Sequence, residues 1–190
     1  MKHEINSQNT KIMLAEALIS LLSNKPLAKI TVSELVSLCN INRKTFYYHF
    51  TDIYDLLEWY LNNEVEKALN LLDPLENFNE VITYSLNYMQ QHTCLRNCID
   101  TPLGRDKITL FLNKHLEPNA YDIITRLEDR YHKKLDTAFK HFLVNNMTQI
   151  TTLSIINAIE HPNKSDADTL KLYLSNVFEA FLDGFFRKKE

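Results

Sequence analysis

The sequence predicts an all-α protein, and three observations lead to that prediction. Only two glycines, Gly104 and Gly184, occur in 190 residues, whereas β-hairpins and phosphate-cradling loops need glycines at positive φ. The five prolines are spread between long stretches in which apolar residues recur at helical spacing. Hydrophobic residues make up 45% and charged residues 24% of the chain, which is ordinary for a globular protein. We therefore expect about nine helices, three in a small N-terminal domain and the rest in a helical bundle.

The composition also limits the location and the class of function. No stretch approaches the roughly 20 apolar residues that a membrane span needs, and the start MKHEINSQNTK has no hydrophobic segment of signal-peptide type. Three cysteines, an odd count, fit a reducing compartment, so we expect a cytoplasmic protein. An enzyme is the weakest hypothesis, because there is no glycine-rich loop, paired catalytic motif or metal constellation. We accordingly predict no cofactor and no metal site.

Charge is distributed unevenly along the chain. Residues 1–50 carry a formal charge of +3, although the whole chain carries −3. The remaining residues are therefore acidic. This asymmetry indicates that only the N-terminal end contacts a polyanion.

The first two helices are expected on either side of Pro26. The segment KIMLAEALISLLSNKP places four leucines on one helical face, namely Leu14, Leu18, Leu21 and Leu22. The next segment, ITVSEL, has the pattern of a capping box, in which Thr31 and Glu34 each accept a hydrogen bond from the other's backbone N–H. A second helix should therefore start at Thr31.

The third helix is expected to follow after a very short turn. In CNIN, Asn40 suits the left-handed position that ends a helix, and Asn42 suits an N-cap. The helix from Arg43 to Phe50 would then turn Phe46 and Phe50, four residues apart, toward the core. We expect three residues to receive them there: Leu35, Leu38 and Ile41.

Two short helices joined by a three-residue turn, the second of them basic, form a helix-turn-helix. Its outward side chains suit a DNA duplex, because cations can donate to guanine or phosphate and uncharged donors fix the register on phosphates. Free backbone N–H groups at the start of the second helix add a phosphate-binding position. The predicted DNA-binding residues are Thr31, Ser33, Arg43, Lys44, Thr45, Tyr47, Tyr48 and His49. The alternative is an ordinary solvated helix face.

A long fourth helix should begin after Thr51 or Asp52 as its cap and stop at Pro74, because leucines recur at helical spacing between them. Further helices are expected at about 78–93, 104–116, 119–146, 148–160 and 166–187.

Two clusters in the body invite a functional interpretation beside an ordinary one. Tyr84, Tyr88 and His92 form one stripe, which either lines an effector pocket or belongs to the core. Cys94 and Cys98 lie four residues apart and are either a redox-sensing pair or small buried apolar residues.

The last predicted helix is apolar around more of its circumference than the ~100° stripe of a surface helix. Either the helix is buried within its own domain, or one side packs internally and the other meets a second copy. We favour the dimer, because a helix-turn-helix needs two half-sites. The predicted helix at 119–146 would supply the other half of a four-helix bundle between protomers.

The run from Ile30 to Leu61 resembles the DNA-binding domain of the TetR family of bacterial transcriptional regulators, in which a T-x-Y-x-x-F recognition helix precedes a long leucine-rich helix. Thr45, Tyr47 and Phe50 carry that pattern here. With the first helix, the resemblance covers roughly residues 8–72. It implies an all-α homodimer that places two recognition helices in successive major grooves of a pseudo-palindromic operator. It also implies a divergent C-terminal domain that binds a small effector.

The expected division is thus a DNA-binding domain over residues 1–51 and a ligand-binding and dimerisation domain over residues 52–190. A repressor is the expected function. Two departures from the family pattern stand out: Asn40 replaces a usual glycine, and Ile53 replaces a lysine that often holds phosphate. The second departure keeps open a coregulator that binds another regulatory protein instead of DNA.

Overall fold

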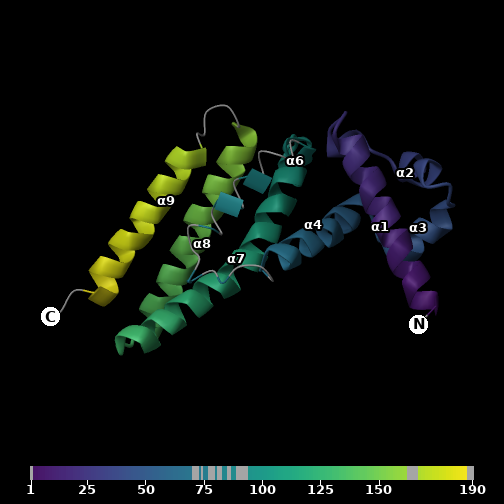
Figure 1. The fold of residues 1–190 in the computed structure, drawn as a ribbon. Coiled ribbons are helices and arrows are strands. Elements are labelled where there is room, and N and C mark those ends of the chain that lie inside the picture. Colours follow the sequence, from purple (N-terminus) through teal and green to yellow (C-terminus); the bar gives the residue numbers. More distant parts are fainter. Residues whose placement is uncertain are drawn as a thin grey trace. The chain divides into compact units, whose positions relative to one another are not determined.

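The all-α prediction is confirmed by the fold (Figure 1). This is a computed structural model, and it describes residues 2–69, 73, 75–76, 80, 83–84, 87–88, 94–161 and 167–187. None of these residues lies in a β-strand. No helix in this part of the chain is both long and apolar enough to cross a membrane. The helix predicted at 78–93 falls largely outside the described residues.

The chain divides into two compact units. The N-terminal unit comprises Met1–Ala68 and His92–Ile108, and the C-terminal unit comprises Leu69–Gln91 and Thr109–Glu190. The predicted boundary after Thr51 divides the chain by function, into a DNA-binding domain and a ligand-binding and dimerisation domain. It stays a prediction.

Short helices packed on a longer one build the N-terminal unit. Its elements are α1 (Lys2–Leu22), the 3-10 turn η1 (Leu27–Lys29), α2 (Val32–Leu38), α3 (Arg43–His49), α4 (Ile53–Leu69, of which the last residue belongs to the other unit) and α6 (Cys94–Cys98). Helix α1 packs against α2 and α6, and α2 packs against α3. Leu14, Leu18 and Leu22 of α1 are fully buried, whereas Leu21, the fourth leucine predicted for this face, is only partly buried.

The start of α4 is fixed by a reciprocal cap. The Asp52 carboxylate accepts from the Asp55 N–H at 2.8 Å, and the Asp55 carboxylate accepts from the Thr51 N–H at 2.8 Å. Of the two predicted caps, Asp52 is therefore the one that holds the first turn.

A close backbone approach explains one of the two glycines. Helix α7 (Pro102–Tyr131) begins against the end of α6, and a Cβ on Gly104 would lie 2.0 Å from the Cys98 carbonyl oxygen. Only a residue without a side chain fits there. The same region is joined to α1 by the Asn97 amide, which donates to the Leu22 carbonyl at 2.6 Å.

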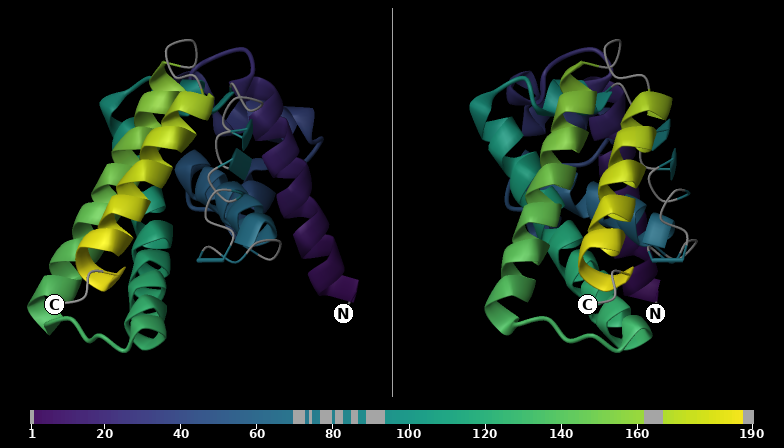
Figure 2. Two further views of the ribbon diagram at one scale, coloured as in Figure 1. Left: turned by 60° about the vertical axis from the view of Figure 1, so that its left-hand side comes forward. Right: turned by 90° about the vertical axis from the view of Figure 1, so that its left-hand side faces the viewer.

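Three long helices lie side by side in the C-terminal unit (Figure 2). They are the part of α7 from Thr109 onward, α8 (Thr137–Glu160) and α9 (Ala167–Leu182), and α9 continues into the π-helical turn η2 (Asp183–Arg187). Their core includes Ile124, Leu127, Val144 and Phe178, all at most 8% exposed.

The predicted break between helices 104–116 and 119–146 is wrong, because α7 runs through Pro118. A proline in a helix interior removes one hydrogen bond and crowds the preceding turn. Pro118 lies on the exposed face of α7, however, while Phe111 and Ala120 on either side of it are 7% exposed. Burial of both flanking turns outweighs the local cost of the proline.

The predicted continuity of residues 119–146, and the break placed before 148, are also wrong. Helix α7 ends at Tyr131 with His132 at φ 52°, and the Lys133 N–H donates to the Glu128 carbonyl at 3.0 Å. This is a Schellman-type C-terminus made without glycine. Asp136 then caps α8, since its carboxylate accepts from the Phe139 N–H at 3.1 Å.

A buried ion pair holds this helical hairpin together. The Lys140 ammonium lies 3.0 Å from the Glu128 carboxylate and 2.7 Å from the Thr125 hydroxyl. The other Glu128 oxygen accepts from the Leu135 N–H at 2.8 Å. Burial acts to raise the pKa of Glu128, but the Leu135 N–H and the Lys140 ammonium outweigh it, so the pKa lies below its ordinary value. Glu128 is therefore ionised at neutral pH.

Candidate nucleic-acid interface

The predicted capping box of α2 is present. The Thr31 hydroxyl accepts from the Glu34 N–H at 3.3 Å, and the Glu34 carboxylate accepts from the Thr31 N–H at 2.9 Å. The other Glu34 oxygen pairs with the Lys25 ammonium. The hydrogen bond from Lys25, followed by those from Thr31, lowers the pKa of Glu34 to about 2. The ion pair between Lys25 and Glu34 was not predicted, because the two residues lie nine positions apart on either side of a turn and no sequence pattern connects them.

Asparagine residues form both ends of the turn between α2 and α3, as predicted. Asn40 adopts φ 50°, and the Ile41 N–H donates to the Val36 carbonyl at 3.0 Å, which closes α2 as a Schellman motif. The Asn42 side chain then accepts from the Thr45 N–H at 2.8 Å and from the Thr45 hydroxyl at 3.1 Å. Local side chains thus fix the angle at which α3 leaves the turn.

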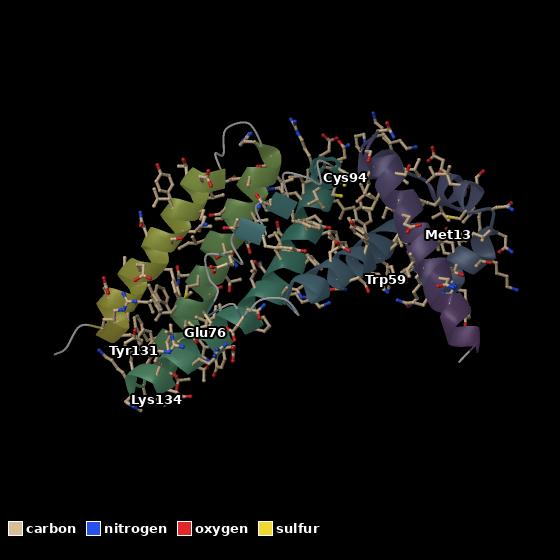
Figure 3. All side chains as sticks on the ribbon, viewed as in Figure 1. Met13, Trp59, Glu76, Cys94, Tyr131 and Lys134 are labelled. Carbon is tan, nitrogen blue, oxygen red and sulfur yellow. The ribbon has the colours of Figure 1, made fainter. Side chains whose placement is uncertain are left out.

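Aromatic packing holds the back of α3. Phe46 is fully buried and Phe50 is 3% exposed, with ring centroids 6.0 Å apart. Phe50 also packs edge-on against Trp59 of α4 at 6.0 Å (Figure 3). The Lys11 ammonium lies 5.9 Å from the Phe50 ring, within the range of a cation–π contact.

The expectation that Leu38 joins this inner face is wrong, because its side chain is 60% exposed. Cys39 takes the inward position at the end of α2, since it follows Leu35 by four residues and so lies on the same face. Its thiol donates to the Met13 carbonyl on α1 at 3.5 Å.

The front of α3 carries the predicted side chains outward. Tyr47 is 52% and Tyr48 is 72% exposed. The remaining residues divide into two groups: Thr31, Ser33, Arg43 and Lys44 are exposed, and Thr45 and His49 are partly buried. All eight therefore reach the surface of one small region formed by α2 and α3.

The electrostatics of this surface are not uniform along α3. Burial, and to a lesser extent the charge of Lys11, lowers the pKa of His49. The imidazole is therefore neutral at pH 7 and can offer a phosphate an N–H but no charge. The two cations, Arg43 and Lys44, stand at the N-terminal end of the helix. Ile53, where a lysine was expected from the resemblance, is the first residue of α4 and is partly buried.

The predicted effector stripe is described only in part. Tyr84 is 36% exposed and Tyr88 is partly buried, while His92 lies outside the described residues. A cleft of about 370 Å³ is present in the C-terminal unit, but neither tyrosine lines it. The stripe therefore stays a prediction.

The thiols of α6 have the properties of core residues. Cys94 and Cys98 are 6% and 1% exposed and form no disulfide. Burial raises the pKa of Cys94, and it raises the pKa of Cys98 to about 12. Because the thiolate is the reactive form, this favours packing over redox sensing.

Two short helices, a tight capped turn and an exposed basic second helix define the helix-turn-helix class of fold. No protein-family model matches the sequence, and comparison with curated proteins gives no match. Solved structures do match it.

One is a dihydroxyacetone kinase operon activator, DhaS, with a TM-score of 0.70 and 19% identity over 93% of this chain and 98% of that one. Another is a TetR transcriptional regulator from Streptococcus agalactiae 2603V, with a TM-score of 0.59 and 24% identity over 93% and 98%. A third is Thermus thermophilus FadR, a TetR family transcriptional repressor in complex with lauroyl-CoA, with a TM-score of 0.65 and 14% identity over 95% and 97%. The chain therefore has the fold of TetR-type regulators, over nearly its whole length.

Proposed function

We propose that this protein is a TetR-type transcriptional regulator that binds a duplex DNA operator through the front of α3. The single observation that carries the proposal is the two-sided character of this helix. Its back is fixed by Phe46 and Phe50, while its front presents Lys44, Tyr47 and Tyr48 to solvent. A rigid helix with cationic and hydroxyl groups on one face suits the major groove.

The proposed contacts divide by what they do. Arg43 and Lys44, at the end that enters the groove, donate to guanine O6 and N7 or to phosphate. The Thr45 and Tyr47 hydroxyls and the His49 N–H fix the register on phosphates, and the Tyr48 ring edge contacts a thymine methyl. Thr31 and Ser33 offer phosphate contacts at the start of α2.

A homodimer is part of the proposal. Two operator half-sites one turn of DNA apart, about 34–36 Å, require two helix-turn-helix units, one from each protomer. Exposed apolar side chains on the two C-terminal helices support it. They are Phe142, Ile150 and Leu153 on α8 and Leu172, Tyr173 and Val177 on α9. Because the residues 119–146 do not form one helix, the proposed four-helix interface uses α8 and α9 of each protomer.

Control by a small effector completes the proposal. The effector, bound near Tyr84, Tyr88 and His92, would favour one of two states. In only one of them does the spacing of the two α3 helices match that of the operator half-sites. It can do so only through its differential affinity for those states. Repression is the proposed outcome of operator binding, although DhaS, one of the similar structures, is an operon activator.

Selection of bound fragments from a random duplex pool at moderate salt tests this proposal directly. Recovery of a palindrome would support DNA binding, the dimer and the half-site spacing together. A matched selection with Tyr47→Phe and Lys44→Ala together should recover no enriched sequence, because two proposed contacts are lost while the buried back of α3 is untouched. An enriched palindrome from that double variant would refute the assignment of α3.

A coregulator that binds another protein is the second candidate. Ile53 at the start of α4 and the acidic charge of residues 51–190 favour it. In that case duplex DNA would not be retained even at low salt, where electrostatic binding is strongest, whereas a partner protein would be.

A further inference from the structure

The cations that α3 itself carries all stand at one of its ends. Arg43 and Lys44 occupy the first two positions of the helix. After them, no lysine or arginine occurs in the sequence before Lys67. The chain that leaves the C-terminal end of α3 leads instead into two carboxylates, Asp52 and Asp55. Neither the last turn of α3 nor the start of α4 therefore has a lysine or arginine of its own.

This uneven distribution matters for a helix placed in the major groove of DNA. Phosphates line both sides of the groove, and contacts to them fix the register and the orientation of the protein. The C-terminal end of α3 offers a phosphate the His49 N–H but no charge, because burial, followed by the charge of Lys11, lowers the pKa of the imidazole. The negative end of the helix dipole lies there as well. A cation for this end has to come from another helix.

Lys11 of α1 lies at this end of α3. Its ammonium is 5.9 Å from the centre of the Phe50 ring and 5.8 Å from the centre of the ring of Trp59, which Figure 3 labels on α4. Phe50 is the C-cap of α3, and the centre of its ring is 6.4 Å from that of His49. Lys11 is thus placed beside the junction of α3 and α4.

The two aromatic rings position the ammonium without neutralising its charge. Phe50 is 3% exposed and packs edge-on against Trp59, and a cation over such rings is attracted to their faces. Lys11 is partly buried, and it pairs with no carboxylate in the part of the chain that the structure describes. Its charge is therefore left to water, which a phosphate oxygen can replace. Lys25, by contrast, is already paired with Glu34.

The position of Lys11 is also continuous with the front of α3. The His49 ring packs against the Tyr48 ring with centroids 4.9 Å apart, and Tyr48 is 72% exposed. Tyr48, His49 and Lys11 therefore form one group of side chains, which begins in the proposed interface and ends in a cation.

We propose that Lys11 binds a phosphate of the DNA backbone together with the His49 N–H, and that this contact holds the C-terminal end of α3 on the duplex. The inference rests on the proposed function, since it needs a duplex in contact with the front of α3. It adds a residue of α1 to an interface so far built from α2 and α3 alone.

The salt dependence of binding separates the charge of Lys11 from its packing. Lys11→Met keeps an apolar stem over Phe50 and Trp59 but removes the charge, whereas Lys11→Arg keeps both. Fluorescence anisotropy with a duplex that carries the selected palindrome should give Lys11→Met a salt slope shallower by about 1.8 per dimer, one phosphate per protomer. The ratio of wild-type to variant affinity should then fall about twelvefold between about 50 and 200 mM salt. Lys11→Arg should keep the wild-type slope. An unchanged slope in Lys11→Met, or an equal loss of slope in Lys11→Arg, would overturn the proposal.

Lys107→Met is the matched control for general attraction between the protein and DNA. Lys107 is exposed near the start of α7 and belongs to the same compact unit, but it follows α6, which packs against α1 and η1. The substitution removes the same charge, so the slope should stay at the wild-type value. Equal losses of slope in Lys107→Met and Lys11→Met would mean that no specific contact is made at Lys11.

Ethylation interference on the same duplex locates the contact. Ethylation neutralises a phosphate, so at one phosphate in each half-site it should weaken binding of the wild type and no longer weaken binding of Lys11→Met. Trp59 is the only tryptophan in the chain, and its emission should be the same in free Lys11→Met as in the wild type. Interference lost at several phosphates together with a shifted emission would mean that Lys11 only positions α3, which overturns the proposal.

Failure of this inference and failure of the proposed function give different results. If the wild type binds no duplex, the proposed function is refuted and the inference with it. If the wild type binds with a steep salt slope and Lys11→Met has the same slope and the same ethylation pattern, the inference alone is refuted.

Discussion

The α2–α3 turn and the α7–α8 hairpin join helices in different ways. In the first, the residues that end one helix and start the next, Asn40 and Asn42, act on backbone groups within five residues of themselves. In the second, Glu128 and Lys140 lie twelve residues apart on different helices and meet only when the hairpin is folded. The helix-turn-helix of α2 and α3 is therefore specified by contacts between residues close in sequence, whereas the α7–α8 hairpin depends on a buried tertiary contact.

The largest expected effect comes from breaking that contact. Lys140→Met leaves Glu128, 4% exposed, with its charge buried and its closest cation gone, which should cost about 3–5 kcal/mol in the free energy of unfolding. Urea denaturation of the full chain measures it.

The matched control is Lys134→Met. Lys134 pairs with Glu128 at 3.9 Å and with Asp129 at 2.6 Å, but its side chain is 69% exposed. Its loss should cost less than about 1 kcal/mol. Equal losses in the two variants would mean that burial is not what makes the hairpin pair important.

Next in size is Gly104→Ala, at the junction of α6 and α7. The added methyl group would collide with the Cys98 carbonyl oxygen, so the free energy of unfolding should fall by about 1–3 kcal/mol. Gly184→Ala is the control, because nothing lies within 4 Å of the added atom. Thermal unfolding of both variants measures the difference. If Gly184→Ala destabilises the protein as much as Gly104→Ala does, the close approach to Cys98 is not the cause.

A smaller loss of unfolding free energy is expected from a change in the turn between α2 and α3. Asn42→Ala removes the acceptor for the Thr45 N–H and should cost about 0.5–2 kcal/mol. Asn42→Asp keeps an acceptor in place and should retain most of that stability. If both substitutions destabilise equally, the cap is not what starts α3.

The smallest effect is a pH dependence at Glu34. Its folded-state pKa of about 2 lies below the ordinary 4.5, so its contribution to stability is complete above the ordinary value and is lost as pH falls through the folded value. The difference in unfolding temperature between the wild type and Glu34→Gln should therefore be largest above about pH 5. It should decrease as the pH is lowered toward about 2. A difference that does not change with pH would contradict the Lys25 and Thr31 contacts as its cause.

The same contrast explains what the sequence could predict. Both caps, the left-handed Asn40 and the buried Phe46 and Phe50 follow from residue types and spacing, and all are present. Leu38 was misassigned because the last residue of α2, Leu38, and the C-cap that follows it, Cys39, were both candidates for one inward position.

In the C-terminal unit, the sequence patterns predicted the wrong helix boundaries. Pro118 lies inside α7, and the chain turns instead at His132, which is neither of the usual helix-ending residues, Gly and Asn. Burial of neighbouring turns decided both cases, and burial is set by helices far away in the sequence. The single local signal was Asp136, three residues before the N–H that it caps.

The central claim, that the front of α3 binds duplex DNA, is tested most directly by the salt dependence of binding. Fluorescence anisotropy of a labelled operator duplex should give a steep fall of log affinity with log salt, with a slope near −0.9 per neutralised phosphate. If Lys44 contacts phosphate, Lys44→Ala should make the slope shallower by about 1.8 in a dimer, one contact per head. Absence of duplex binding at low salt, or an unchanged slope and affinity in Lys44→Ala, would contradict the claim.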